Sequence, residues 1–275
     1  MSENRQIGSF EDPYSPEGTD KQVHRFNHRH LTPLHSHHRG HLVYPVTGVL
    51  SLTTVQGSWI APANRIAWVP AGAVHQHRAH GAVDMRLVYL DPNPAEQLPE
   101  HPAVLLMTPL AREAVLALTG GAAGEDTSRG PERRARLRQV LLDELGPSPE
   151  QPLHLPLPRD PRLRQVAALL AEDLSRPVTL EQIGRRIGVG ERTLSRLCRE
   201  ELGMGYRQWR SQYRLHRAMV LLAEGRPVLR TGAECGWSTA STFSDAFKRL
   251  VGKTPGEYRR LAAGQGAGDS VLAPR

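Results

Sequence analysis

Apolar residues recur every three or four positions across the C-terminal third of the chain, which is the spacing of helices with one buried face. Between residues 179 and 198 this pattern is interrupted at Gly188, and between residues 230 and 248 it is interrupted at Gly236. Each segment is therefore predicted to form a short helix, a glycine turn and a second helix. Two such helix-turn-helix patterns, separated by a long predicted helix over residues 206–224, favour DNA binding over chance helical packing.

The first motif has polar side chains on the face opposite its apolar stripe. Thr179 and Gln182 have the spacing of a capping box, so its first helix is predicted to begin there. The outward face of its second helix consists mostly of arginines, which can bond guanine edges or hold phosphates. The predicted DNA contacts of this motif are Arg192, Ser195, Arg196 and Arg199, and we expect the first three to reach base edges.

The second motif presents a shorter and less basic outward face. Its predicted core residues are Ala233, Trp237, Phe243 and Phe247. Its predicted DNA contacts are Ser241, Thr242, Asp245 and Lys248. Because this face carries fewer cations, we expect it to contribute less sequence readout than the first motif.

The residues from Gly236 to Arg259 resemble the signature of the AraC/XylS family of bacterial transcription regulators. The family pattern has a glycine-aromatic pair, then Phe-x-x-x-Phe-Lys/Arg on the recognition helix, then Gly-x-x-Pro. This chain has these features at Gly236-Trp237, Phe243, Phe247-Lys248, Gly252 and Pro255. It departs from the pattern at two core positions, where Cys198 replaces the usual aromatic residue and Trp237 replaces the commoner Phe or Tyr. The resemblance covers residues 160–260 and implies a DNA-binding transcription regulator.

From residue 23 to residue 90, short apolar runs are separated by Gly, Pro and Asn, which is typical of short antiparallel strands. Hairpin turns are predicted at residues 62–64 and 70–72. Turns this frequent favour a small antiparallel barrel or jelly roll.

The next segment is predicted to be helical, with Pro109 and Pro131 each in the first turn of a helix. The second of these helices carries an apolar stripe made of Leu137, Val140, Leu141 and Leu145. The stripe can pack against its own domain or pair with a second subunit, and the sequence favours neither. Residues 147–159 are dense in proline and are predicted to be a semi-extended connector.

Ten of the 13 histidines lie between His24 and His80, in the predicted β region. The segment from His35 to Gly48 resembles the first cupin motif, with His41 in place of the usual Glu. Pro70, Gly72 and His75 resemble the second cupin motif. Sensor domains of many AraC-family proteins resemble cupins, so the two resemblances agree.

Strand geometry lets these histidines converge, because residues two and four apart on a strand share a face. His35, His37 and His41 are predicted to point inward, and His75 on another strand can complete the set. Neutral imidazoles suit Zn, Ni, Cu or Fe better than Mn or Mg. Two interpretations stay open: a divalent metal at His35, His37, His41 and His75, or a metal-free pocket whose imidazoles bond ligand oxygens. Tyr44, Trp59, Trp68 and Arg65 are expected to line the effector pocket, and the remaining histidines of the region, His24, His28, His30, His38, His77 and His80, are expected at the surface.

The predicted fold class is α+β. A cupin-like antiparallel β-barrel is followed by a helical linker or dimerisation segment and an all-α domain with two helix-turn-helix motifs. The expected divisions are a flexible tail at 1–21, a sensor domain at 22–100, a helical segment at 101–146, a proline-rich linker at 147–159, a DNA-binding domain at 160–262 and a disordered tail at 263–275.

Charge and cysteine content agree with this division. The chain carries a net charge of +7, and residues 159–262 hold 20 Lys and Arg against 11 Asp and Glu. The basic excess therefore belongs to the predicted DNA-binding region, as expected for a surface that meets phosphates. Cys198 and Cys235 are predicted to be buried core residues and not a disulfide scaffold. The sequence has neither a signal peptide nor a long apolar run, so we expect a soluble cytoplasmic protein without a membrane partner.

Three functions are compatible with the sequence. The leading hypothesis is a non-enzymatic transcription regulator that binds double-stranded DNA as a homodimer and responds to a small-molecule effector. Its domain pattern resembles AraC-family members that control neighbouring transporter or efflux genes, and RNA polymerase is a further expected partner if the protein is an activator. The alternatives are a metal-dependent cupin enzyme with a DNA-binding tail, in which Asp84 and histidines are the nearest acid-base groups, and a metal sensor.

Overall fold

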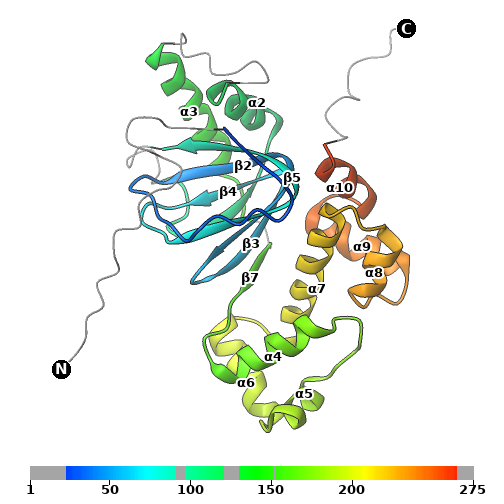
Figure 1. The fold of residues 1–275 in the computed structure, drawn as a ribbon. Helices are drawn as coiled ribbons and strands as arrows, with labels where there is room; N and C mark the ends of the chain where they lie inside the picture. Colours follow the sequence, from blue (N-terminus) through cyan, green and yellow to red (C-terminus); the bar gives the residue numbers. More distant parts are fainter. Residues whose placement is uncertain (1–22, 91–96, 121–129, 151–152, 265–275) are drawn as a thin grey trace, which may run out of the picture.

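The computed structural model describes residues 23–90, 97–120, 130–150 and 153–264. Seven strands in these ranges form one antiparallel sheet in the N-terminal region, with the order β1-β5-β2-β3-β7 and with β4 pairing with β2 and β6 (Figure 1). The first five strands are β1 (Val23–Phe26), β2 (His41–Thr54), β3 (Gly57–Pro62), β4 (Arg65–Val69) and β5 (His75–Tyr89). Turns are present at both predicted places, between β3 and β4 and between β4 and β5. They are not hairpin turns, however, because β3 pairs with β2 and β7, β4 pairs with β2 and β6, and neither turn connects two paired strands.

Two strands lie outside the predicted sensor domain. β6 (Ala103–Leu106) pairs with β4, and β7 (His154–Pro156) pairs with β3. The division at residue 100 was therefore too early, and residues 154–156 of the predicted connector are a strand with Leu155 buried. Strands of three and four residues next to prolines are too short to show alternation, which is why the sequence pattern missed them. The predicted tail at 1–21, and all but two residues of the tail at 263–275, lie outside the described residues.

Two helices cover one face of the sheet (Figure 1). α2 (Pro109–Leu118) and α3 (Pro131–Leu145) begin at the two prolines predicted to start them, and Thr108 caps α2 by accepting from the Ala111 amide. Leu141 and Leu145 of α3 are buried in the core cluster beneath these helices, with Leu137 and Val140 partly buried against it. The apolar stripe of α3 is thus occupied by packing within its own chain.

The C-terminal region is entirely helical. Its elements are α4 (Pro161–Glu172), α5 (Leu180–Ile187), α6 (Glu191–Leu202), α7 (Tyr206–Ala223), α8 (Val228–Glu234), α9 (Ala240–Val251) and α10 (Pro255–Ala262). The local signals in the sequence are confirmed: Asp160 caps α4, Thr179 and Gln182 form a capping box on α5, and Gly188 ends α5 with φ of 71°. Gly236 lies between α8 and α9 with φ of 80°, where a Cβ would meet the backbone of Leu174.

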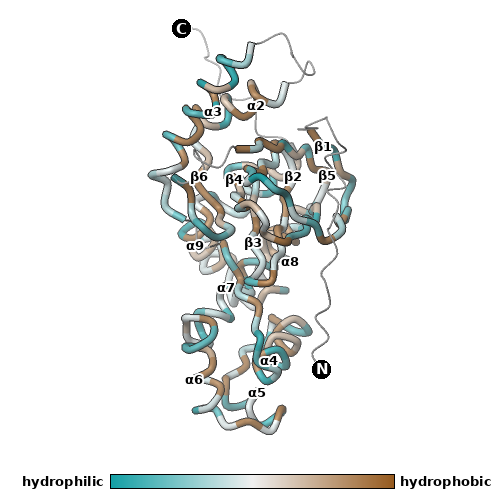
Figure 2. Tube along the Cα trace, turned by 90° about the vertical axis from the view of Figure 1, so that its left-hand side faces the viewer, coloured by the Kyte–Doolittle hydropathy of each residue, from teal (hydrophilic) through white to brown (hydrophobic). Residues whose placement is uncertain are grey.

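The long helix α7 connects two separate cores. Trp209 and Tyr213 in its first half pack with α4, α5 and α6. Its second half, which includes Leu215 and Leu222, packs in one cluster with residues of α9, α10 and the sheet. The helices α4 to α6 lie beyond the far end of α7, away from the strands in both views (Figures 1 and 2). Within the described residues, no helix is both long and apolar enough to span a bilayer.

Candidate nucleic-acid interface and histidine cluster

Five buried imidazoles converge on one side of the sheet, although His41 and His75 lie at opposite ends of the β2–β5 ladder. The backbones of His35 and His75 exchange two hydrogen bonds, of 2.9 and 2.8 Å, and their ring centroids lie 4.3 Å apart. His41 begins β2, and its ring lies 4.4 Å from that of His37 and 5.1 Å from that of His75. His77 joins from β5, with its ring 5.0 Å from that of His75. The prediction that His35, His37, His41 and His75 come together is thus met, although His35 and His37 precede β2 and do not lie on it.

These imidazoles form two overlapping groups with spacing suitable for a metal ion. One group is His37, His41 and His75, and the other is His35, His75 and His77, with ligand atoms within 4.8 Å of one another in each. The Nδ1 atoms of His35 and His75 lie 2.8 Å from the carbonyls of Pro33 and Ala73. Since a carbonyl only accepts, each Nδ1 is the donor, which leaves Nε2 with a lone pair able to bind a metal.

The cluster favours neutral imidazoles. Burial lowers the pKa of His41 well below 6.5, and the neighbouring His75 and His37 lower it further. Burial likewise lowers the pKa of His77 well below 6.5. Both ring nitrogens of His41 and the Nδ1 of His77 are buried without a hydrogen-bond partner. Buried polar atoms are nearly always bonded, so these nitrogens fit a missing ligand, and neutral imidazole is the form that binds transition metals.

Three histidines expected at the surface are buried. His24, His77 and His80 are each exposed by 6% or less, whereas His28, His30 and His38 are exposed as predicted. His77 is the addition that matters to the site, and a sequence signal for it existed. It stands two residues after His75, and residues at this spacing on a strand share a face.

The four residues predicted to line the effector pocket do not come together. Tyr44 and Trp68 belong to the core beneath α2 and α3, where Tyr44 donates to the Ala63 carbonyl and Trp68 to the Pro99 carbonyl. Strand alternation explains this, because Tyr44 is three residues from His41 and so lies on the opposite face of β2. Trp59 stacks on His154 at 4.3 Å, and Arg65 is engaged elsewhere, as described below. The aromatic neighbour of the cluster is Tyr89, 5.5 Å from both His37 and His41.

The predicted DNA-contacting side chains lie on the outer faces of α6 and α9. Arg192, Arg196 and Arg199 are exposed and Ser195 is half-buried, while Leu194, Leu197 and Cys198 are buried on the opposite side of α6. On α9, all four predicted contacts are exposed: Ser241, Thr242, Asp245 and Lys248. Phe243 and Phe247 are buried beneath them, and Trp237 is partly buried against them. Ala233 was expected in this core but is exposed, because the short helix α8 turns it to solvent.

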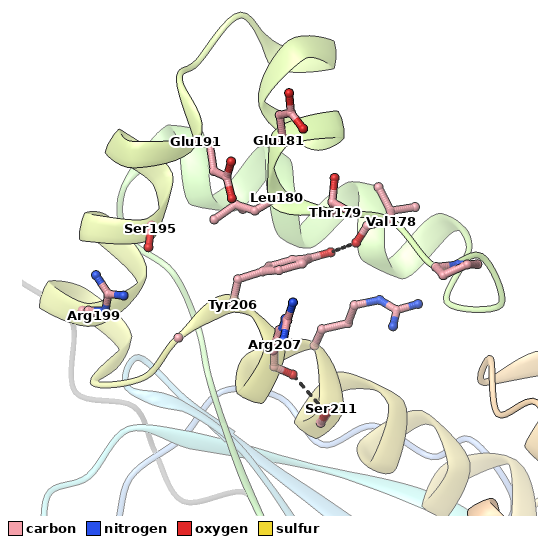
Figure 3. A pocket seen from close by; sticks show the side chains of 13 residues that line it. Val178, Thr179, Leu180, Glu181, Glu191, Ser195, Arg199, Tyr206, Arg207 and Ser211 are labelled. Atoms are coloured by element: carbon pink, nitrogen blue, oxygen red, sulfur yellow. Dashed lines mark hydrogen bonds between the residues drawn. The ribbon is translucent and has the colours of Figure 1, made fainter.

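A groove of about 760 Å³ lies beside the first helix pair, between α5, α6 and the start of α7 (Figure 3). Ser195 and Arg199 of α6 line it from one side and Arg207 of α7 from another. Tyr206 stabilises this arrangement, because its hydroxyl donates to the Val178 carbonyl at 2.9 Å. Arg207 was missed by the sequence reasoning, since only the packing of α7 against the first pair brings it to this groove.

Comparison with known proteins decides the family. A family model described as a helix-turn-helix domain matches residues 183–261, which span most of the first helix pair and all of the second. The HTH-type transcriptional regulator NimR of Escherichia coli K12 is 31% identical over 230 residues, covering 82% of each chain. The chain belongs to the AraC family of helix-turn-helix transcriptional regulators. It is therefore a DNA-binding protein, and its family supports a role other than that of an enzyme.

Two further similarities are more limited. The arabinose operon regulatory protein of Escherichia coli K12 is 29% identical over 125 residues, covering 45% of this chain and 42% of that protein. The structure of ToxT from Vibrio cholerae with a bound unsaturated fatty acid is 11% identical, covers 89% of this chain and 96% of that one, and has a TM-score of 0.39. A TM-score of this size supports no conclusion about the ligand of the present AraC-family chain.

Proposed function

We propose that this AraC-family chain is a sequence-specific transcription regulator whose N-terminal cupin-like domain senses a small molecule through a metal ion held by the histidine cluster. The observation that supports the metal is the buried group of His37, His41 and His75, in which both nitrogens of His41 have no hydrogen-bond partner. Elsewhere in the described chain, buried histidine nitrogens do not gather in this way.

DNA recognition is assigned to the outer faces of α6 and α9. Arg192, Ser195 and Arg196 are proposed to reach base edges, and Arg199 and Lys248 to hold phosphates. Ser241, Thr242 and Asp245 are proposed as the groove-facing residues of α9. By resemblance to the family, the expected assembly is a homodimer, the expected targets are neighbouring transporter or efflux genes, and RNA polymerase is a partner if the protein activates.

The donor set limits which metal fits. Three or four neutral imidazoles suit Zn, Ni, Cu or Fe, and His37, His41 and His75 would hold the ion with His35 beside them. Such an ion would supply open coordination positions for an effector with a donor atom. The protein's own contribution is to keep these imidazoles neutral, buried and oriented through the Nδ1 contacts of His35 and His75.

The cupin-enzyme alternative receives less support. Both groups of potential metal ligands consist of histidines alone. Asp84, the nearest acid-base candidate from the sequence, forms a bidentate pair with Arg86 at 2.7 and 2.9 Å. Both carboxylate oxygens of Asp84 are therefore engaged by the Arg86 guanidinium. In the metal-sensor alternative, binding of the ion itself changes DNA affinity. In the proposal, a small molecule bound at the ion changes it.

Elemental metal analysis of purified, tag-free protein tests the proposal, beside a His37→Ala/His41→Ala double variant and a His28→Ala control. His28 is exposed and lies outside both groups. The expected result is near-stoichiometric metal in the wild type and the control, and its loss in a folded double variant. Metal-free wild-type protein that also fails to take up Zn, Ni, Cu or Fe would refute the metal and leave an organic effector pocket.

A further inference from the structure

A second crevice lies on the other side of β5 from the histidine cluster. Since strand side chains alternate, His75 and His77 point to the cluster, while Gln76, Arg78 and His80 point to the opposite side. There they line a crevice of about 460 Å³, whose other wall includes Tyr213, His216 and Arg217 of α7. The crevice therefore lies between the sheet and the helix that connects the two helix-turn-helix pairs.

The lining of this crevice is basic and lacks a carboxylate. Neither Arg78 nor Arg217 forms an ion pair with a described residue, and both are exposed. The sheet side adds the hydroxyls of Ser51, Thr53 and Ser58. Two cations facing hydroxyl and amide groups, with no acid between them, form a site complementary to an anion.

Two imidazoles in the lining are prepared for a polar ligand. His80 Nε2 lies 2.7 Å from the Ser51 hydroxyl, so its orientation is fixed by a partner inside the crevice. His216 Nε2 is buried and has no hydrogen-bond partner among the described residues. Two guanidinium groups that form no ion pair among the described residues, next to the Ser51–His80 contact, favour an anion supplied from outside the chain.

We propose that this crevice binds a small organic anion, a carboxylate with a compact body, between Arg78 on the sheet and Arg217 and His216 on α7. The apolar part of the ligand packs against Leu155, Leu174 and Val220, which line the same crevice. This site is distinct from the histidine cluster and needs no metal, so it goes beyond the proposed function.

Because the crevice lies between β5 and α7, a ligand bound in it would affect how α7 is held against the sheet. The first half of α7 packs with α4 to α6, and its second half packs with α9, α10 and the sheet. His216 and Arg217 lie near the middle of α7, where its two halves meet. A ligand bridging α7 and β5 therefore fixes the first helix pair, with α6, relative to the sheet.

Calorimetric titration of the full chain with benzoate, hexanoate and citrate tests this proposal, with uncharged benzamide as the shape-matched control. Each titration is run with and without EDTA, which separates the crevice from any metal at the histidine cluster. The variants are Arg78→Gln/Arg217→Gln, which removes the cations, and Thr53→Phe, which fills the crevice and keeps them. Arg133→Gln, an exposed arginine of α3, is the matched charge control.

The expected result is that at least one carboxylate binds with or without EDTA, that benzamide does not, and that Arg133→Gln binds as the wild type does. Binding should weaken at least tenfold in both folded crevice variants. The proposal is overturned if none of the three carboxylates binds, if binding disappears with EDTA, or if either crevice variant binds normally. Because these titrations contain no DNA, such a result leaves the proposed DNA-binding function standing.

Discussion

Arg65 on β4 donates from Nη2 to the carbonyl of Val251, the last residue of α9, at 3.0 Å and across 186 positions of sequence. Arg65 is only 4% exposed, and burial lowers its pKa. The C-terminal carbonyls of a helix carry partial negative charge, so the guanidinium satisfies a group that α9 leaves open. The second recognition helix is thereby fixed to the sheet.

Removing the hydrogen bond between Arg65 and the Val251 carbonyl should destabilise the folded chain. Arg65→Met leaves the Val251 carbonyl buried without its charged donor, and we expect the free energy of unfolding to fall by about 2 kcal/mol in urea. Amides of α9 should also exchange faster. Arg136→Met, which removes an arginine that is 71% exposed, is the control and should change stability by less than about 0.5 kcal/mol. Equal stability of the two variants would mean that Arg65 does not secure α9.

Arg196 tests the assigned DNA face. In the free protein its guanidinium is exposed and paired with Glu200 at 3.2 Å, an i,i+4 pair that contributes little to stability. Arg196→Ala should weaken binding to a specific site by about 1–3 kcal/mol and relax specificity at one base pair. A competition assay over single-base variants of the site measures this. Uniform weakening on every sequence would instead make Arg196 a phosphate contact.

Single histidine variants separate the two potential metal groups. With the ion at His37, His41 and His75, His41→Ala and His75→Ala should each abolish stoichiometric metal, while His77→Ala should retain it. Metal content per folded chain is the measurement, with circular dichroism to confirm folding. Loss of metal in His77→Ala with retention in His41→Ala would move the ion to the group formed by His35, His75 and His77.

His216 should make stability depend on pH. Burial, with His80 and His154 nearby, lowers its pKa to about 3. A base whose pKa is lower in the folded state contributes stability that is present above pH 6.5 and lost as the pH falls toward 3, because the unfolded chain binds the proton first. In urea unfolding from pH 7.5 to 4.5 with EDTA, His216→Gln should show a slope smaller by about 1.4 kcal/mol per pH unit below pH 6.5. Parallel curves for wild type and variant would contradict the shifted pKa.

Local chemistry explains why the helical region was predictable from the sequence. Asp160, Thr179 and Gly188 each mark a helix end through a rule that involves only neighbouring residues, and the structure has helix ends at all three. The convergence of His35, His37, His41 and His75 was also predictable from motif spacing, but the strand-geometry argument did not hold for His35 and His37, because both precede β2.

Features that depend on long-range packing were not predictable in this way. Tyr44 and Trp68 were both expected beside the histidines. Alternation from His41 would have placed Tyr44 on the opposite face, but the position of Trp68 depends on the register of β4 against β2, where Trp68 pairs with Leu42. The partner of Arg65 lies in another region of the fold. The strand at residues 154–156 is defined by its pairing with β3, because three residues carry no periodic signal.

The most direct test of the proposed function is whether a small metal-coordinating molecule changes DNA affinity only when the histidine cluster holds its metal. Fluorescence anisotropy of the full chain with DNA from upstream of its own gene would screen such molecules on metal-loaded and chelator-stripped protein, with His41→Ala as the control. We predict that at least one molecule changes the affinity of the metal-loaded wild type at least tenfold, a coupling of about 1.4 kcal/mol, and leaves the stripped protein and the variant unchanged. A change in affinity on metal removal alone, with no effect of any molecule on the metal-loaded protein, would contradict the proposal and favour the metal-sensor alternative.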